Sequence, residues 1–259
     1  MASLAIAREG GVLRVTMDRP EVHNAFDEAM IAAIDEAFGE SAGDPQARAI
    51  VLAGRGKAFS AGADIQWMKR QSEATEEANL ADARRFASML HRIATSPKPT
   101  VAAVQGACMG GGVGLVCACD FAIAAASARF SVSEARFGII PAVIGPYLIA
   151  AVGAREAKRL ALSTARIDAA EALRIGLVHE VVPEETLSEA VDALLGQLRM
   201  AAPGAIAEVK ALYSKLGPMG IGPEARELTA ATIARIRGTE EAREGFAAFL
   251  EKRGARWTL

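Results

Sequence analysis

The chain has 259 residues, the length of one large domain or of a domain with a helical extension. Hydrophobic residues make up 51% of it but aromatic residues only 5%, so small side chains must fill much of the core. The net charge is −2, from 29 basic and 31 acidic residues, with no block of like charge. This balance argues against nucleic acid and against anionic membrane surfaces as partners.

Residues 1–10 lack the apolar core of a secretory signal, and no apolar run approaches the roughly 18 residues of a membrane span. Cys108, Cys117 and Cys119 are odd in number and crowd into one Gly/Ala-rich stretch, which argues against a secreted disulfide framework. The three histidines lack metal-ligand spacing. We therefore expect a cytoplasmic protein without a metal site.

Regular patterns predict alternating strands and helices in the first part of the chain. Alternating apolar residues over 13–17, after a turn at Gly10-Gly11, indicate a β-hairpin. Asp27 is placed to cap a helix through 30–38, and a further helix is expected over 83–94. More strands are expected at 47–53, 100–105, 121–124 and 130–133. This alternation predicts an α/β architecture.

Beyond Pro141 the pattern becomes almost wholly helical. Helices are expected at 155–162, 168–174 and 184–200, with a short strand at 177–182. From residue 203 onward, three helices are separated by glycines and prolines. We divide the chain into a core of residues 1–200 and a helical region of residues 201–259, which must pack on the core or on another subunit.

Two loops follow predicted strands and are rich in small residues, so their backbone can approach a ligand closely. The first is Lys-Ala-Phe-Ser-Ala-Gly-Ala-Asp-Ile over 57–65, in which Asp64 can cap the next helix. A plain capped turn also explains this stretch. The second runs from Gln105 to Leu115 and opens a helix, whose first N–H groups are unpaired at the positive end of the helix dipole. No Lys-Ser/Thr pair follows its glycines, which argues against a phosphate-binding loop.

Four motifs, in order and in register, resemble those of the enoyl-CoA hydratase/isomerase (crotonase) family. They are Phe59–Asp64, Val104–Gly112, Cys119-Asp120 with the following strand, and Phe130–Pro141. The similarity extends from Arg19-Pro20 to Arg253, nearly the whole chain. It implies a crotonase-like spiral of ββα units with a C-terminal helical trimerisation region. The assembly would be a homotrimer or a dimer of trimers.

The resemblance also implies roles for residues of both loops. The N–H groups of Ala63 and Gly111 would form an oxyanion hole for the thioester carbonyl of an acyl-CoA substrate, where charge develops in the reaction. Glu134 matches the catalytic glutamate that moves a proton as general acid or base. Coenzyme A is then part of the substrate, and no further cofactor is needed.

Further positions match the coenzyme A site of the family. The backbone around Ala61 and Ile65 would meet the adenine, and Asp64 and Gly110 belong to the same binding loops. Phe249 and Lys252 match tail residues that reach the coenzyme A of a neighbouring subunit, although an amphipathic helix with a solvated lysine explains them as well. The side chains at Trp67, Met68, Met89 and Val143 are candidates for the acyl pocket, but core packing explains each of them alone.

Gly114 departs from the family pattern, because hydratases commonly carry a second glutamate there. Glu134 alone can still hydrate a 2-enoyl-CoA, which is the activity we expect. Bacterial methylglutaconyl-CoA hydratases of leucine breakdown and isohexenylglutaconyl-CoA hydratases of terpene breakdown are similar around this position, and glycine at 114 would leave room for a branched acyl group. The alternatives are a double-bond isomerase, for which one base suffices, and a non-catalytic acyl-CoA-binding oligomer.

Overall fold

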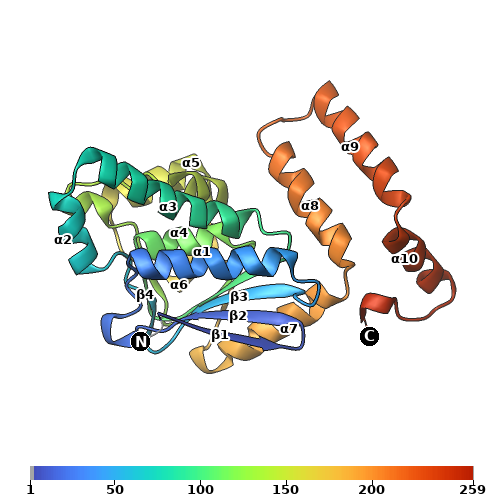
Figure 1. Ribbon diagram of the computed structural model, residues 1–259, viewed down its shortest axis with the longest axis horizontal. Coiled ribbons are helices and arrows are strands. Elements are labelled where there is room, and N and C mark those ends of the chain that lie inside the picture. The colour runs from blue at the N-terminus through green and yellow to red at the C-terminus, as the bar shows by residue number, and fades with distance from the viewer. Residues whose placement is uncertain (1–2, 259) are drawn as a thin grey trace.

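A six-stranded sheet lies at the centre of the fold in the computed structural model, which describes residues 3–258 (Figure 1). The order is β1-β2-β3-β5-β7-β10, in which the β1–β2 hairpin is antiparallel and the other neighbours are parallel. The strands are β1 (Leu4–Glu9), β2 (Val12–Met17), β3 (Ala49–Gly54), β5 (Thr100–Val104), β7 (Phe121–Ala125) and β10 (Glu180–Val182). The expected hairpin and α/β architecture are confirmed.

A second, four-stranded sheet has the order β4-β6-β8-β9. Its members are β4 (Ala58–Ser60), β6 (Ala107–Met109), β8 (Arg129–Ser131) and β9 (Ile167–Asp168). Three times in succession the chain makes one strand of the large sheet, one strand of the small sheet and then a helical segment. Strands β4 and β6 were not predicted from the sequence, because three residues are too few to show an alternating pattern.

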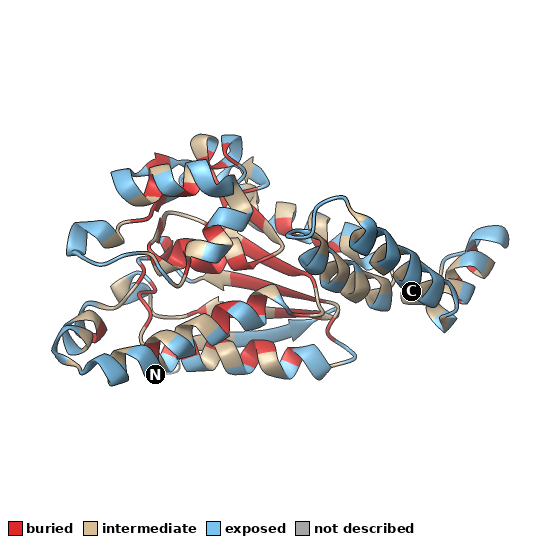
Figure 2. Cartoon of the chain, turned by 90° about the horizontal axis from the view of Figure 1, so that it is seen from above, coloured by how far each residue is buried: buried red, intermediate tan, exposed pale blue. Residues whose placement is uncertain are grey.

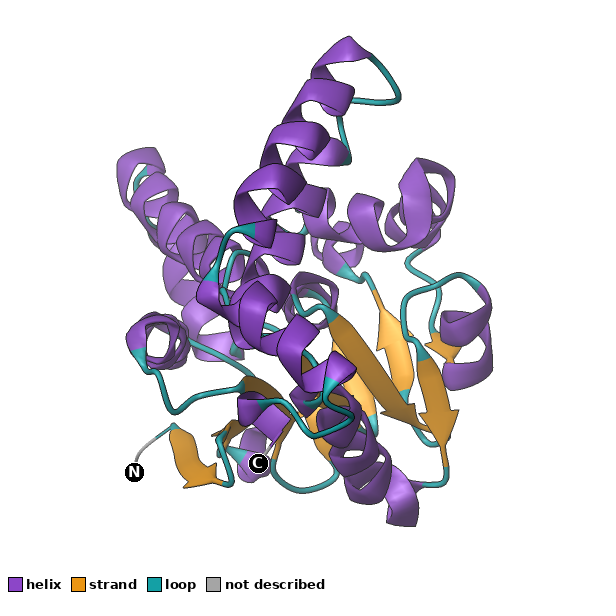
Figure 3. Ribbon diagram, turned by 90° about the vertical axis from the view of Figure 1, so that its right-hand side faces the viewer, coloured by secondary structure: helices purple, strands orange, loops and turns teal. Residues whose placement is uncertain are grey.

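Helices cover both faces of the large sheet, whose inner strands β2, β3, β5 and β7 form the buried centre of the molecule (Figures 2 and 3). Alternate strand residues serve the two faces, as the twofold period of a strand requires. Leu13 and Ile50 join the main core, whereas Val12 and Val51 pack with Val191 of α7. The main core is formed with α1 (Glu28–Gly43), α3 (Glu76–Ala94), α4 (Gly111–Ala118) and α5 (Gly145–Ser163), and α7 spans Leu187–Arg199.

Two aspartates begin helices as expected. Asp27 accepts a hydrogen bond from Met30 N at the start of α1, and Asp64 caps α2 (Ile65–Glu73). Helix α5 begins at Gly145, ten residues before the expected 155. Gly153, with φ 74° and ψ 158°, interrupts this helix, and the interruption masks the apolar period of its first part in the sequence. A shorter helix, α6, spans Ala169–Arg174.

Three helices complete the chain, as expected from the glycine and proline positions: α8 (Pro203–Leu216), α9 (Pro223–Arg237) and α10 (Glu240–Leu250). They extend away from the sheets in Figure 1. Phe246, Phe249 and Leu250 of α10 are 61%, 82% and 78% exposed, so residues 3–258 provide no cover for this apolar face. Among residues 3–258, no helix is long and apolar enough to span a membrane.

Candidate active site

A cavity of about 1220 Å³ lies where the loops after β4, β6 and β8 meet. These three strands are parallel neighbours in the small sheet, so their carboxyl ends face the same edge and bring the following loops together. Seven of the site residues expected from the sequence line this cavity: Ala61, Ala63, Asp64, Ile65, Gly110, Gly111 and Glu134.

In the loop after β4, all backbone N–H groups from Ala61 to Asp64 but one donate hydrogen bonds. Ala61 N donates to His23 O at 2.8 Å, Gly62 N to Ser60 Oγ at 3.1 Å, and Asp64 N to Phe26 O at 3.0 Å. The N–H of Ala63 has no partner within the described chain. The neighbouring hydrogen bonds therefore fix this loop and leave one N–H group available at the cavity.

The loop after β6 repeats this arrangement. Gly110 N donates to Ser131 O at 2.8 Å, whereas Gly111 is the first residue of α4, and its N–H has no partner among residues 3–258. A Cβ on Gly111 would lie 2.3 Å from Cζ of Phe26, so only glycine fits beneath this ring. An N–H at a helix start also carries the positive end of the helix dipole.

Phe26 contacts both loops. Its N–H donates to Gly62 O at 2.9 Å and its carbonyl accepts from Asp64 N, so its backbone brackets Ala63. Its side chain, 1% exposed, lies against Gly111. One buried residue thus sets the spacing between the two available N–H groups. This role was not predicted from the sequence, because Phe26 stands there as an ordinary core residue before a helix.

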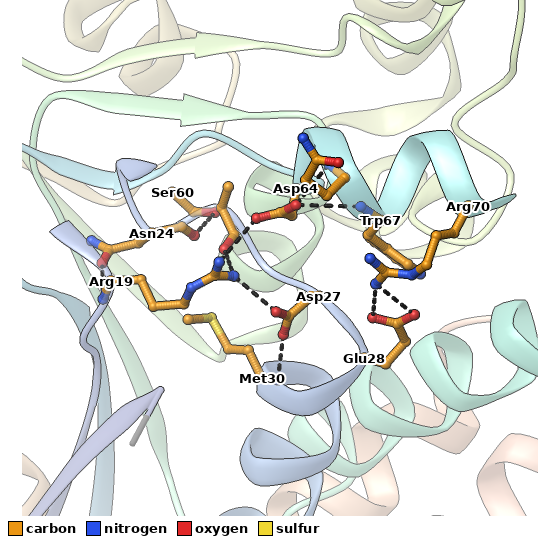
Figure 4. A network of polar contacts seen from close by, with 11 residues as sticks. Arg19, Asn24, Asp27, Glu28, Met30, Ser60, Asp64, Trp67 and Arg70 are labelled. Carbon is orange, nitrogen blue, oxygen red and sulfur yellow. Dashed lines mark hydrogen bonds and ion pairs between the residues drawn. The ribbon is translucent and has the colours of Figure 1, made fainter. Parts of the chain in front are cut away.

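Asp64 lines the cavity, but both of its carboxylate oxygens are engaged (Figure 4). Oδ1 accepts from the N–H groups of Gln66 and Trp67, and Oδ2 pairs with Arg19 at 3.0 Å. Burial by itself would raise the pKa of Asp64, but these hydrogen bonds and Arg19 together lower it. Arg19 also pairs with Asp27, so this network ties the loop to the start of α1. The Asp64 side chain holds the loop in place.

Glu134 lies three residues after the end of β8, at the start of a short 3-10 helix (Glu134–Phe137). Its Oε2 is buried without a hydrogen-bond partner, one of only two such side-chain atoms in the described residues. Burial raises the pKa of Glu134 against the opposing effect of hydrogen bonds from its own N–H and that of Ser133. Oε1 lies close to Gly110, 3.3 Å from where a Cβ would be. A free carboxyl with a raised pKa beside two N–H donors is suited to proton transfer.

Gly114 does not line the cavity, and the expectation that it leaves room for a branched acyl group is wrong. A Cβ at this position would lie 2.3 Å from Cγ2 of Ile144, which is itself 2% exposed. Ile144 therefore fills the space. Of the candidates for the acyl pocket, Met68 lines the cavity, whereas Trp67 and Met89 are buried in the core and Val143 packs against it.

Phe249 lies near the end of α10 and Lys252 two residues after it, and α10 is far from α2, whose first residues line the cavity (Figure 1). Neither residue lines this cavity. Conversely, the cavity includes residues that sequence analysis did not identify. Among them are His23, Ser131, Ser133, Arg136, Phe137, Ile139 and Arg166. Arg166 precedes a strand of only two residues and carried no recognisable signal.

The fold and sequence match known proteins over almost their full length. The signature of the enoyl-CoA hydratase/isomerase family covers residues 7–259. A Thermus thermophilus protein described as an enoyl-CoA hydratase is 37% identical, over 96% of this chain and 98% of its own. The carnitinyl-CoA dehydratase of Salmonella typhi is 36% identical, over 98% of both chains.

A crystal structure of an enoyl-CoA hydratase from Shewanella pealeana superimposes with a TM-score of 0.96 at 40% identity. The match covers 98% of this chain and 96% of that one. This likeness confirms the expected crotonase-like fold, in which the repeated strand, strand and helix units wind as a spiral. The chain belongs to the enoyl-CoA hydratase/isomerase family.

Proposed function

We propose that this enzyme adds water across the double bond of a 2-enoyl-CoA thioester. The observation that carries the proposal is the meeting, in one cavity, of two unpartnered N–H groups, at Ala63 and Gly111, and the unpartnered carboxyl oxygen of Glu134. The carnitinyl-CoA dehydratases of Salmonella are named for removal of water from a CoA thioester, the reverse of the same reaction.

The chemistry needs each of these groups. Water oxygen bonds to Cβ, Cα gains a proton, and the thioester carbonyl carries negative charge as an enolate in between. The N–H groups of Ala63 and Gly111 stabilise that charge, and loss of one such donor typically raises the barrier by roughly 2.7 to 4 kcal/mol. Glu134 as carboxylate accepts a proton from the attacking water and returns it to Cα, which yields a 3-hydroxyacyl-CoA.

Coenzyme A would enter along the loop after β4, with its adenine near Ala61 and Ile65. Both residues line the cavity, and Ile65 is 79% exposed at its edge. For the acyl group we propose a branched, methylglutaconyl-type chain. Its support is the likeness around Glu134 and the cavity volume, since Gly114 provides no space. No cofactor beyond the CoA thioester takes part in this proposal.

A double-bond isomerase is the second candidate. Ile144 fills the place beside Gly114, so the cavity has one unengaged carboxyl group, and an isomerase needs only one base to remove and return a proton. A panel of crotonyl-CoA, 3-methylglutaconyl-CoA and a 3-enoyl-CoA, with product identification, separates the two. Hydration of either 2-enoyl thioester supports the proposal. Turnover of the 3-enoyl thioester alone, to its 2-enoyl isomer, would replace it.

The proposal includes assembly as a homotrimer or a dimer of trimers, in which Phe249 and Lys252 reach the coenzyme A of a neighbour. The exposed apolar face of α10 supports this assembly, because such a surface needs cover. Sedimentation should give a particle of three or six times the 27.0 kDa chain. An active monomer at micromolar concentration would withdraw both residues from the site.

A further inference from the structure

Two arginines line the same cavity as Glu134, and they differ in how they are held. Arg136 is fixed to the backbone and hydroxyl of Thr164, through Nη2 at 2.9 Å and Nε at 2.8 Å. Arg166 is exposed, and within residues 3–258 its guanidinium has no ion-pair or hydrogen-bond partner. The cavity therefore contains one guanidinium that is free to bind a ligand.

The strand register explains why Arg166 lines the cavity. Strands β8 and β9 are antiparallel, with Phe130 opposite Ile167, and both of these residues are buried in the main core. One step further along this register, Ser131 comes opposite Arg166. Successive side chains of a strand alternate between its faces, so this pair faces away from the core. Ser131 and Arg166 both line the cavity, in agreement with this register.

The order of the small sheet arranges the groups of the site in a row. The loops after β4, β6 and β8 carry Ala63, Gly111 and Glu134 in turn, and Arg166 comes just before β9. A thioester carbonyl held by the first two residues thus has Glu134 on one side, and Arg166 lies beyond it. The adenine end, near Ala61, lies on the opposite side of the row.

The spacing suits a short acyl chain with an acidic end. Two strand spacings of about 4.8 Å each, roughly 10 Å, separate β6 from β9. An acyl chain of five carbons spans roughly 5 Å at about 1.5 Å a bond, and the arginine side chain can cover the rest. The two acidic residues of the cavity do not neutralise Arg166, because Asp64 pairs with Arg19 and Glu134 lies beyond ion-pair distance of it.

We propose that Arg166 binds the terminal carboxylate of the acyl group, so that the substrates are CoA thioesters of unsaturated dicarboxylic acids. A guanidinium matches a carboxylate with two parallel hydrogen bonds, which a neutral acyl chain cannot make. This inference rests on the proposed function, whose methylglutaconyl-type acyl group ends in a carboxylate, and it assigns the residue that recognises that end. Arg166 acts in recognition, while Glu134 and the two N–H groups carry the reaction.

The test uses two saturated thioesters with five-carbon acyl groups, glutaryl-CoA and pentanoyl-CoA, which cannot be hydrated. Calorimetry on the assembled protein should show that Arg166→Gln weakens binding of glutaryl-CoA about tenfold or more, as expected for a lost charge-assisted hydrogen bond. Binding of pentanoyl-CoA should stay within about twofold. Arg166→Lys should retain part of the preference. Arg155→Gln, at an exposed arginine of α5 outside the cavity, is the matched control and should change the affinity for neither thioester.

If Arg166→Gln lost affinity equally for both thioesters, the proposal would be overturned, because Arg166 would then bind the phosphates of coenzyme A that the two ligands share. An unchanged affinity for both thioesters would overturn the proposal as well. Because the readout is binding without turnover, it is independent of hydration. A protein with the predicted Arg166 dependence that hydrates no 2-enoyl-CoA would refute the proposed function and leave the recognition of an acidic acyl group standing.

Discussion

Ile144 occupies the space that a side chain at position 114 would need, since its Cγ2 would lie 2.3 Å from a Cβ placed on Gly114. Leu90 closes the other side at 3.6 Å. The two positions are complementary in volume, and position 114, where the resemblance would imply a second glutamate, is part of the packed core. The reaction proposed for this site must therefore proceed with Glu134 as its single carboxylate.

Gly114→Glu should destabilise the protein, because the new side chain overpacks the core and carries a charge into it. Overpacking typically costs about 1 to 3 kcal/mol, and the buried charge adds to that. The double variant Gly114→Glu with Ile144→Gly should recover part of the loss in urea unfolding. Gly196→Glu, on α7 where a Cβ meets nothing within 4 Å, is the control. Equal stability of the two single variants would contradict the complementarity of positions 114 and 144.

Glu134→Gln should reduce kcat at least tenfold, roughly 1.4 kcal/mol of barrier, while acyl-CoA binding persists. The amide keeps the shape of the side chain but cannot accept or return a proton. Steady-state kinetics with the best substrate of the panel measures the loss. Glu189→Gln, at an exposed glutamate of α7, should leave kcat unchanged. A Glu134→Gln variant that keeps more than a tenth of the wild-type rate would show that another group moves the proton.

The raised pKa of Glu134 also predicts how stability depends on pH. Burial favours the protonated acid in the folded state, so its pKa lies above the ordinary 4.5 of an unfolded chain. The contribution of protonated Glu134 to the free energy of unfolding is therefore complete below pH 4.5, and it is lost as the pH rises through the pKa of the folded state. Glutamine does not ionise. The melting temperature of Glu134→Gln should thus exceed that of the wild type at pH 7, and this difference should close toward pH 4. A gap that widens on acidification would mean that the pKa is lowered.

Local patterns allowed much of the fold to be predicted. The alternation over 13–17 predicted one strand of the hairpin, and the aspartates at 27 and 64 marked the starts of two helices, because capping depends on neighbouring residues only. Strands β4 and β6 were missed since each has three residues, and the first part of α5 was missed because Gly153 interrupts it.

The site was predicted where motifs carry it and missed where packing alone does. Ala63, Gly111 and Glu134 stand in recognisable stretches, so the resemblance identified them. The complementarity of Gly114 and Ile144 joins residues thirty positions apart, and the role of Arg166 depends on the pairing of β8 with β9. Neither relationship leaves a local pattern in the sequence.

Phe26→Leu should reduce kcat more than it changes the affinity for acyl-CoA, because the ring of Phe26 sets how the loop after β4 and the start of α4 face each other. The sensitive readout is the C=O stretch of a bound thioester, which reports polarisation by the two N–H groups. We expect a smaller shift than in the wild type. Phe38→Leu, at another fully buried phenylalanine of the main core, should lose comparable stability with an unchanged shift. The same shift in both variants would reduce Phe26 to a packing residue.

The tail after α10 offers a prediction about the region that carries Lys252. The Arg253 guanidinium donates two hydrogen bonds to the Glu244 carboxylate, at 2.7 and 3.1 Å. The same carboxylate accepts a hydrogen bond from Arg256 N at 3.0 Å. The Arg253 hydrogen bonds, against the opposing effect of burial, lower the pKa of Glu244 to about 2. The carboxylate therefore stabilises the tail fully above the ordinary pKa of 4.5, and this contribution is lost as the pH falls toward 2.

Glu244→Gln should accordingly loosen residues 251–258 at neutral pH without unfolding the sheets, which the tail does not help to build. Amide hydrogen exchange should be faster in this segment alone, and acidification should narrow the difference between the variant and the wild type, corrected for intrinsic exchange rates at each pH. Glu240→Gln changes an exposed glutamate on the same helix and should leave the exchange as it is. Protection of the tail that survives in Glu244→Gln would mean that contacts other than this carboxylate hold Lys252 in place.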